Sequence, residues 1–93
     1  MLEVEEERAI TYLPKIFKSL ADPMRIKILQ NLEKRDYCVC ELISVLKISQ
    51  PTVSYHISLL ANAGLITTHK EGRKVICKLK KKGLTHKLLK VVE

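Results

Sequence analysis

The stretch from Leu46 to Leu65 has the sequence LKISQPTVSYHISLLANAGL, and it contains the signals for the start, buried face and end of one helix. Ser49 is a good N-cap, and Pro51 falls in the first turn, where a backbone N–H group is not needed. Gly64 suits the position just past a helix end, because glycine tolerates the left-handed backbone found there. Apolar residues recur at helical spacing and predict a buried face: Val53, Ile57 and Leu60. We therefore predict a helix from Ser49 to Ala63.

The other positions of this helix place uncharged polar side chains outward: Gln50, Thr52, Ser54, Tyr55 and Ser58. Amide, hydroxyl and phenol groups can form hydrogen bonds with the base edges exposed in the major groove of DNA. Taken alone, the segment equally fits an ordinary amphipathic helix with a small polar face. The flanking segments therefore decide between these two interpretations.

The chain before Leu46 predicts three more helices. An apolar stripe defines the first: Ile10, Leu13, Phe17 and Leu20. Asp22 and Pro23 then form a cap and a first-turn proline for a second helix, whose buried side is Ile28, Leu29 and Leu32. A short third helix lies within YCVCELISVL, with Leu42, Ile43 and Leu46 available for the core. Two short helices joined by a tight turn, the second with a polar outer face, form a helix-turn-helix.

After Gly64 the apolar pattern changes to alternation, which predicts a β-hairpin of the kind called a wing. Its first strand contains Ile66 and Thr68, and its second strand contains Val75, Cys77 and Leu79. The turn EGRK joins the two strands. Basic side chains lie at or near its tip, where they can contact a phosphate backbone beside a docked helix: Lys70, Arg73 and Lys74.

The fold predicted from these patterns is a single domain over residues 1–93, mainly α with a small β-hairpin. It is a winged helix-turn-helix with five helices and a two-stranded wing. A last helix lies within KKKGLTHKLLKVVE, and the core is too small to cover both it and the first helix. We therefore expect a homodimer in which these helices pack across a two-fold axis through Leu13, Phe17, Leu84, Leu88 and Leu89.

The formal net charge of +7 is concentrated near the end of the chain. Residues 1–66 hold eight basic and eight acidic side chains, whereas residues 67–93 hold nine basic and two acidic ones. This pattern favours a nucleic-acid partner, although a solvated lysine-rich surface or an acidic membrane also fits the charge alone. The acidic start and the lack of a long apolar run indicate a cytoplasmic protein without membrane spans. No catalytic triad, acid pair or phosphate-binding glycine loop is present, so we expect neither an enzyme nor a required cofactor.

Four segments together resemble the ArsR/SmtB group of winged-helix repressors: FKSLADPMRIKILQNL, CVCELISVL, ISQPTVSYHISLLANAGLI and KEGRKVICKL. The resemblance covers roughly residues 16–80. It implies a homodimeric repressor on double-stranded operator DNA that is released by a metal, metalloid or other signal. It also implies DNA contacts from Gln50, Thr52, Ser54, Tyr55 and His56, with Arg73 and Lys74 in the wing. Tyr55 departs from the family, because many relatives have histidine there, so the preferred half-site can differ.

Cys38 and Cys40 lie at the place where the family's arsenic, cadmium and lead sensors have CVC. Thiolates are soft ligands, so the pair suits As(III) or a soft divalent metal. The arsenic sensors add a cysteine where this chain has Ile43, and some cadmium sensors use thiols of an N-terminal arm, which here has Glu3, Glu5, Glu6 and Glu7 instead. Sensing of a metalloid, soft metal or oxidation therefore stands beside a packing role for both residues. An odd count of three cysteines in a reducing compartment predicts free thiols.

The remaining candidate side chains are one cysteine and three histidines. Cys77 is expected to be a packed thiol of the second wing strand, and His69 a surface group of the wing. His56 fits either a DNA contact or the seam between helices. His86 lies where the family has a zinc site, but the paired Asp and second His are absent, so we predict no zinc there.

The predicted function is thus a sequence-specific DNA-binding transcriptional regulator, a repressor released by a thiol-reactive signal at Cys38 and Cys40. The alternatives are a DNA-binding regulator without a ligand, and a winged-helix module for protein or RNA contact. A polar outer face and a basic tip favour DNA over a protein partner, which would more often need an exposed apolar patch.

Overall fold

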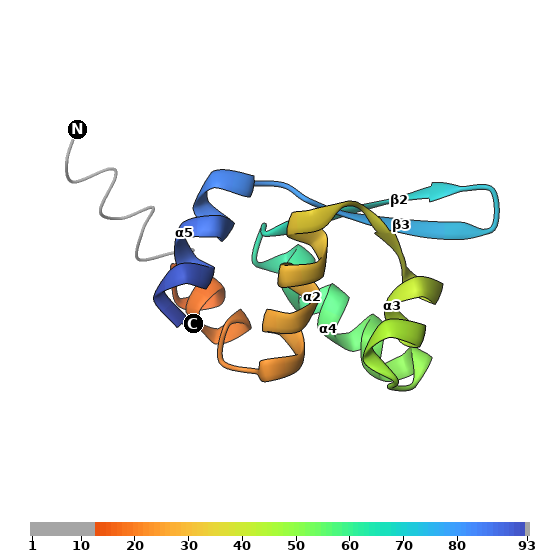
Figure 1. The fold of residues 1–93 in the computed structure, drawn as a ribbon, viewed down its shortest axis with the longest axis horizontal. Coiled ribbons are helices and arrows are strands. Elements are labelled where there is room, and N and C mark those ends of the chain that lie inside the picture. The colour runs from red at the N-terminus through yellow and green to blue at the C-terminus, as the bar shows by residue number, and fades with distance from the viewer. Residues whose placement is uncertain (1–12, 93) are drawn as a thin grey trace.

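The computed structural model describes residues 13–92, which contain five helices and a three-stranded sheet (Figure 1). Residues 13–19 form the first helix. The elements that follow are α2 (Pro23–Lys34), β1 (Tyr37–Cys38), α3 (Val39–Leu46), α4 (Gln50–Asn62), β2 (Ile66–Glu71), β3 (Lys74–Leu79) and α5 (Lys82–Val92). The expected first helix includes Ile10, and Ile10 lies outside the described residues, as do the glutamates of the N-terminal arm.

Helix α2 begins as the sequence predicts. The Asp22 side chain accepts a hydrogen bond from the Met24 N–H at 2.8 Å, and Pro23 occupies the first turn. Its predicted buried side is confirmed, because Ile28, Leu29 and Leu32 are at most 1% exposed. Together they form the centre of the core, so α2 is the support on which the other helices rest.

Helices α3 and α4 form the helix-turn-helix, and Lys47 makes the turn between them. Lys47 has a φ of 56°, in the left-handed region that lets the chain leave α3 and reverse within a few residues. Leu42 of α3 is fully buried, while Ile43 and Leu46 are partly buried against the same core. The predicted helix-turn-helix is therefore confirmed.

The predicted two-stranded wing is confirmed, and the sheet contains one further strand that the sequence does not predict. Strands β2 and β3 are antiparallel and form the wing, with Ile66 opposite Leu79 at its root and Glu71 opposite Lys74 at its tip. The turn between them contains Gly72 at a φ of 63°. Strand β1 adds to the other edge of β3, with Tyr37 opposite Cys77 and Cys38 opposite Ile76. The predicted third helix is confirmed within YCVCELISVL as α3, and the first two residues of that segment, Tyr37 and Cys38, are extended and tie the start of α3 to the root of the wing.

Figure 1 shows α5 and residues 13–19 at one end of the molecule and the tip of the wing at the other. The molecule is elongated, with principal extents of 44 × 29 × 22 Å. None of the helices within residues 13–92 is both long and apolar enough to cross a membrane.

Candidate nucleic-acid interface

Helix α4 is held at both ends by the groups that the sequence predicts. The Ser49 hydroxyl oxygen lies 3.4 Å from the Thr52 N–H and 2.8 Å from the Thr52 hydroxyl, so it caps the first turn. Gly64 follows the last turn at a φ of 77°. The predicted range from Ser49 to Ala63 is therefore confirmed, since these two residues are the caps of the helix.

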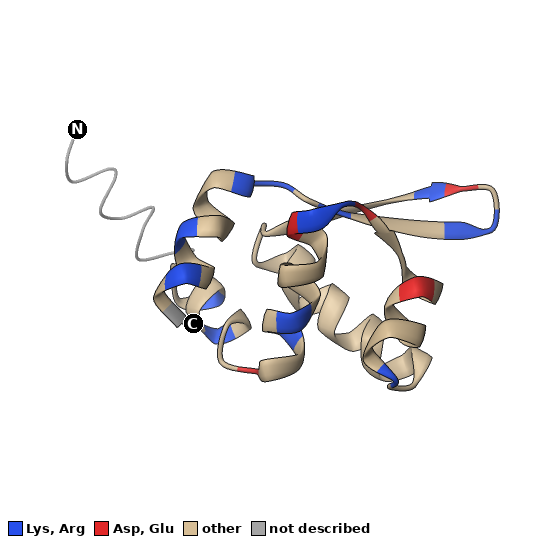
Figure 2. Ribbon diagram, in the orientation of Figure 1, with Lys and Arg blue, Asp and Glu red and all other residues tan. Residues whose placement is uncertain are grey.

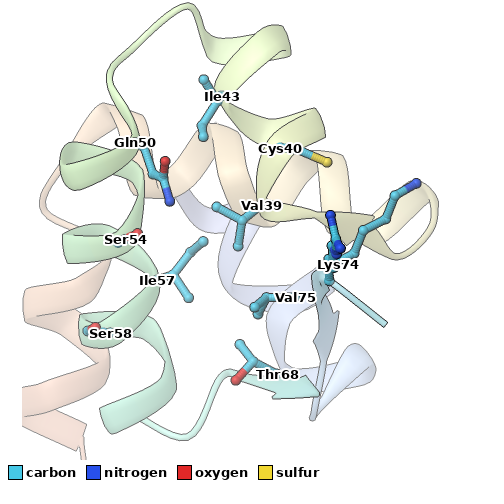
Figure 3. A pocket seen from close by; sticks show the side chains of 11 residues that line it. Val39, Cys40, Ile43, Gln50, Ser54, Ile57, Ser58, Thr68, Lys74 and Val75 are labelled. Atoms are coloured by element: carbon cyan, nitrogen blue, oxygen red, sulfur yellow. The ribbon is translucent and has the colours of Figure 1, made fainter. Parts of the chain in front are cut away.

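The uncharged polar face of α4 is exposed, as the periodicity predicts. Gln50, Ser54 and Ser58 are spaced four residues apart and line one side of a surface hollow (Figure 3). Tyr55 is not among the residues of this hollow, and 60% of its surface is exposed. The face therefore divides into a row of small polar groups beside the hollow and a phenol that projects into solvent.

The hollow has a volume of about 400 Å³ and lies between α3, α4 and the wing. Apolar side chains form part of its lining, including Val39, Ile57 and Val75, which Figure 3 shows pointing toward its centre. Arg73 and Lys74 of the wing line it opposite α4. Residues that were selected separately on a helix and on a hairpin are thus brought to one concave surface.

Three cations of the wing are exposed: Lys70, Arg73 and Lys74. Figure 2 shows the basic segments near the hairpin end, at a distance from the body of the molecule. No salt bridge within residues 13–92 uses any of these three side chains. Their charges are therefore available to an anionic partner such as a phosphate backbone.

His56 does not lie on the outward face, which corrects its place among the expected DNA contacts. It is 7% exposed, and its Nδ1 atom lies 3.1 Å from Nη1 of Arg25 on α2. The helical angle that puts His56 next to Ile57 on the buried stripe also turns it toward α2. Of the two roles considered, the structure places it in the seam between helices.

The other two histidines pair with carboxylates. His69 lies 3.0 Å from Glu71 within β2, on the exposed surface that was expected. His86 of α5 lies 2.8 Å from Glu33 of α2 and ties the last helix to the core helix. Within the described residues, no group of three or more His, Cys, Asp or Glu side chains is arranged to hold a metal ion.

Cys38 and Cys40 are joined by a disulfide, so the prediction of free thiols is wrong for this pair. The chain changes from extended to helical between them, which brings their Cα atoms to 5.3 Å, within the usual range for a disulfide. Cys38 is 2% exposed, whereas Cys40 is exposed and lines the hollow (Figure 3). The pair therefore connects the buried start of α3 with the surface between α4 and the wing.

A capping box fixes the start of α3, and Cys38 is part of it. The Cys38 sulfur accepts a hydrogen bond from the Glu41 N–H at 3.3 Å, and the Glu41 carboxylate accepts one from the Cys38 N–H at 2.9 Å. Arg35 donates to the same carboxylate at 2.8 Å. The hydrogen bond from Arg35, followed by that from Cys38, holds the pKa of Glu41 below its ordinary value of 4.5.

Cys77 is a free, fully buried thiol of β3, which confirms the packed role expected for it. Burial raises the pKa of its thiol from 9.0 to about 11, because the thiolate would lose its solvation. Cys77 therefore stays protonated near neutral pH and is a poor nucleophile and ligand.

The residues expected at a dimer interface divide into two groups in the single chain. Phe17 is 58% exposed, and Leu13, Leu84 and Leu88 are only partly buried. Leu89 is 1% exposed and belongs to the core of its own chain. Val91, which is not among the residues predicted for the interface, is 82% exposed on α5. The first helix and α5 thus each expose apolar side chains, whereas Leu89 is buried in the core beneath them.

Two basic residues with clear structural roles were not selected from the sequence. Arg25 is 7% exposed and bonds to Ser19, Lys18 and His56. Arg35 lies 3.7 Å from the centre of the Tyr37 ring in addition to its bond with Glu41. Arg25 lies in the segment FKSLADPMRIKILQNL, which resembles the family, but that segment does not reveal its role, and Arg35 lies outside the segments that carry the resemblance. Each role depends on partners in other elements.

A helix-turn-helix with an exposed polar second helix and a basic hairpin beside it defines the chain as a winged helix-turn-helix protein. A family model described as "Bacterial regulatory protein, arsR family" matches residues 22–68, half of the chain. The chain therefore belongs to the arsR family of bacterial regulatory proteins.

Individual relatives agree with this assignment. The chain is 38% identical over 77 residues to the HTH-type transcriptional repressor SmtB of Mycobacterium tuberculosis, covering 83% of this chain and 57% of that protein. It is 42% identical over 62 residues to the arsenical resistance operon repressor of Staphylococcus xylosus, covering 67% of this chain and 60% of that protein. The chain thus spans about three fifths of the length of these curated relatives. Among solved structures, reduced HlyU from Vibrio cholerae N16961 has a TM-score of 0.79 at 30% identity, covering 94% and 95% of the two chains.

Proposed function

We propose that this protein is a homodimeric, sequence-specific transcriptional repressor that releases double-stranded operator DNA when Cys38 and Cys40 are oxidised to a disulfide. The observation that carries the proposal is the position of this disulfide. It joins the buried N-cap of α3 to a residue that lines the hollow between α4 and the wing.

The DNA part of the proposal rests on the concave surface. A helix fits the major groove of B-DNA, which is about 12 Å wide, and small polar side chains can then reach base edges. Gln50, Ser54 and Tyr55 are exposed on α4 and suit this role, with Thr52 and Ser58 beside them. Lys70, Arg73 and Lys74 would contact phosphates next to the same groove and fix the position of the helix.

The dimer part rests on the exposed apolar side chains of the first and last helices. Phe17 and Val91 are 58% and 82% exposed, and Leu13, Leu84 and Leu88 are only partly covered. Packing these helices against a second copy across a two-fold axis would bury them. It would also present two copies of α4 to half-sites about one helical turn of DNA apart.

Oxidation of the pair is a balanced two-electron reaction. With hydrogen peroxide as oxidant, the two thiols lose two electrons and two protons and form the Cys38–Cys40 bond, and the peroxide is reduced to two water molecules. Cys40 is the exposed member, so its thiolate is the group that an oxidant can reach first. Cys38 is the buried resolving partner.

The disulfide can influence DNA binding because Cys38 takes part in two elements of the fold. It is the N-cap of α3, and in β1 it pairs with Ile76 of β3, at the root of the wing. A bond that changes the start of α3 therefore changes how the helix-turn-helix is set against the wing. We expect the reduced form to favour the arrangement that fits DNA, so that oxidation shifts the population away from it.

As(III) or a soft divalent metal is a second candidate signal, because relatives include an arsenical resistance operon repressor. The described residues supply two thiols here but no third ligand, and Cys77 is buried in β3 with a raised pKa. This donor set does not complete a site for a soft ion. Oxidation therefore fits the described residues better than metal binding.

The proposal is tested by measuring the affinity of reduced and peroxide-oxidised protein for its own upstream DNA, at several salt concentrations. We expect oxidation to weaken specific binding at least about tenfold, and affinity to fall steeply with added salt in both forms. Cys38→Ser with Cys40→Ser should bind DNA like the reduced protein and ignore the oxidant. Cys77→Ala is the matched control and should respond like the wild type.

Three outcomes would contradict parts of the proposal. If the double serine variant loses affinity in peroxide as the wild type does, the sensing role of the pair is wrong. If peroxide changes nothing in the wild type, the oxidation switch is wrong, and if arsenite and cadmium also change nothing, the protein is a ligand-independent regulator. If binding shows neither sequence preference nor salt dependence, the winged helix serves a protein partner instead of DNA.

A further inference from the structure

A second hollow lies on the side of α4 that faces away from the wing. It has a volume of about 280 Å³ and is formed by the helix of residues 13–19, the start of α2 and the last turns of α4. Three of its lining residues are basic: Lys15, Lys18 and Arg25. Leu59 of α4 and Ala63, the C-cap of this helix, supply an apolar side. This volume lies just below the usual range for ligand pockets, about 300 to 1,000 Å³, so the hollow suits a small group.

Arg25 is the buried wall of this hollow. Its Nε donates to the Ser19 carbonyl at 2.9 Å, Nη2 donates to the Lys18 carbonyl at 3.2 Å, and Nη1 lies 3.1 Å from His56. Each terminal nitrogen of a guanidinium has two N–H groups, so one on each remains without a described partner. Arg25 therefore fixes the end of the first helix against α4 and still has donors to offer.

Within the described residues, the lining of this hollow contains three cations and no acidic side chain. The two carbonyls belong to the end of a helix, where the dipole amounts to only about half an elementary charge. No salt bridge within residues 13–92 involves Arg25, Lys15 or Lys18. Figure 2 shows basic segments on the first helix and on α2, on both sides of a loop that contains an acidic residue. That residue is Asp22, whose carboxylate caps α2 by accepting from the Met24 N–H and forms no salt bridge with Arg25, Lys15 or Lys18. A buried cation without a carboxylate partner is costly, and an anion in the hollow would remove that cost.

We propose that this hollow is an anion site that binds a phosphate group. Three cations favour a phosphate over a singly charged carboxylate, and the remaining N–H groups of Arg25 together with two flexible ammonium groups can each donate to phosphate oxygens. The phosphate belongs either to a soluble phosphate compound or to the DNA backbone along the far edge of the groove that α4 enters. The site itself does not depend on the proposed function, whereas its occupation by DNA does.

The site is tested by titrating the full chain with inorganic phosphate and following amide signals by NMR, at constant ionic strength adjusted with sodium chloride. We expect saturable shifts at Ser19, Asn62 and Ala63, which line the hollow. Lys15→Gln with Lys18→Gln should weaken this binding about tenfold, because both lysines are exposed and can be changed without unfolding the chain. Lys27→Gln with Lys90→Gln removes the same charge elsewhere on exposed helix surfaces and should leave it unchanged.

A second measurement identifies the source of the phosphate. The salt dependence of binding to a random-sequence duplex is compared between the same two double variants. A larger loss of slope in the Lys15 and Lys18 variant assigns the site to the DNA backbone, and an equal loss in both assigns it to a soluble phosphate compound. The anion site is overturned if phosphate causes no saturable shifts, or if the shifts are the same in both double variants.

Discussion

The two sides of α4 carry positive charge in opposite ways. On the wing side, Arg73 and Lys74 are exposed, belong to no salt bridge among residues 13–92 and face a polar helix surface across a hollow. On the other side, Arg25 is 7% exposed and bonded to two carbonyls and His56. Exposed cations are available to a partner and contribute little to folding, whereas a buried cation holds the fold together. The same charge therefore has different consequences when it is removed on each side.

The largest effect is expected for Arg25→Ala. This change leaves two carbonyls and a histidine nitrogen without their donor, so we expect a loss of about 3 kcal/mol in the free energy of unfolding, measured with urea. Arg25→Lys keeps the charge without the planar fork and should lose less. Lys27→Ala, an exposed neighbour on α2, is the control and should change stability by less than about 0.5 kcal/mol. Equal losses for Arg25→Ala and Lys27→Ala would remove the distinction between the two sides.

Neutralising the wing cations should weaken DNA binding and leave the free energy of unfolding nearly unchanged. For Arg73→Gln with Lys74→Gln we expect stability within about 0.5 kcal/mol of the wild type but DNA affinity about a hundredfold lower. The slope of log affinity against log salt should fall by about two for each protomer bound. Lys87→Gln with Lys90→Gln on α5 is the matched change of charge. A similar loss of slope in that control would show that the wing charges act only through the net charge.

The polar row of α4 should affect specificity more than affinity. Ser54→Ala with Tyr55→Ala removes a hydroxyl beside the hollow and an exposed phenol, so we expect operator preference over random DNA to fall about tenfold. Binding to random DNA should stay the same, because phosphate contacts supply that term. Ser44→Ala, at an exposed position of α3, serves as control. Unchanged operator preference would mean that α4 does not contact bases.

The smallest effect concerns Glu41, which sits in the capping box of α3. The pKa of its carboxyl is lowered in the folded chain, so the stabilisation is present above the unfolded value and is lost as pH falls through the folded value. Glu41→Gln should therefore narrow the difference in thermal midpoint between pH 6 and pH 3. Asp36→Asn is the exposed control. If both variants keep the full pH dependence, the capping carboxylate is not one of its sources.

Much of the fold could be predicted because its signals are local. Ser49, Asp22 and Gly64 mark helix ends through contacts within a few residues. Apolar periodicity then gives the buried faces of α2 and α4, and alternation gives β2 and β3. Strand β1 could not be found in this way, because two residues are too few to show alternation. It exists through pairing with β3, about 40 residues further along the chain.

The candidate site shows the same division. The exposed row of α4 and the basic tip follow from periodicity, since each position is set by its own element. His56 was ambiguous because its partner, Arg25, lies 31 residues earlier on another helix. The Cys38–Cys40 bond was missed because spacing alone does not show whether the chain bends between the two residues. Arg25 was not selected for the same reason, since burial of a charge depends on tertiary contacts.

The short β1 strand also determines how much of the wing extends beyond the three-stranded part of the sheet. This free part acts as a lever arm. From Ile76, the residue of β3 nearest the tip that still pairs with β1, to Arg73 in the wing turn is three residues, or about 10 Å of extended chain. For an arm of this length, a rotation of about 15° at the paired end moves the Cα atom of Arg73 by about 2.6 Å. That shift is close to the whole length of a hydrogen bond, about 2.9 Å, so a small rotation at the root of the wing is enough to separate its tip from a phosphate.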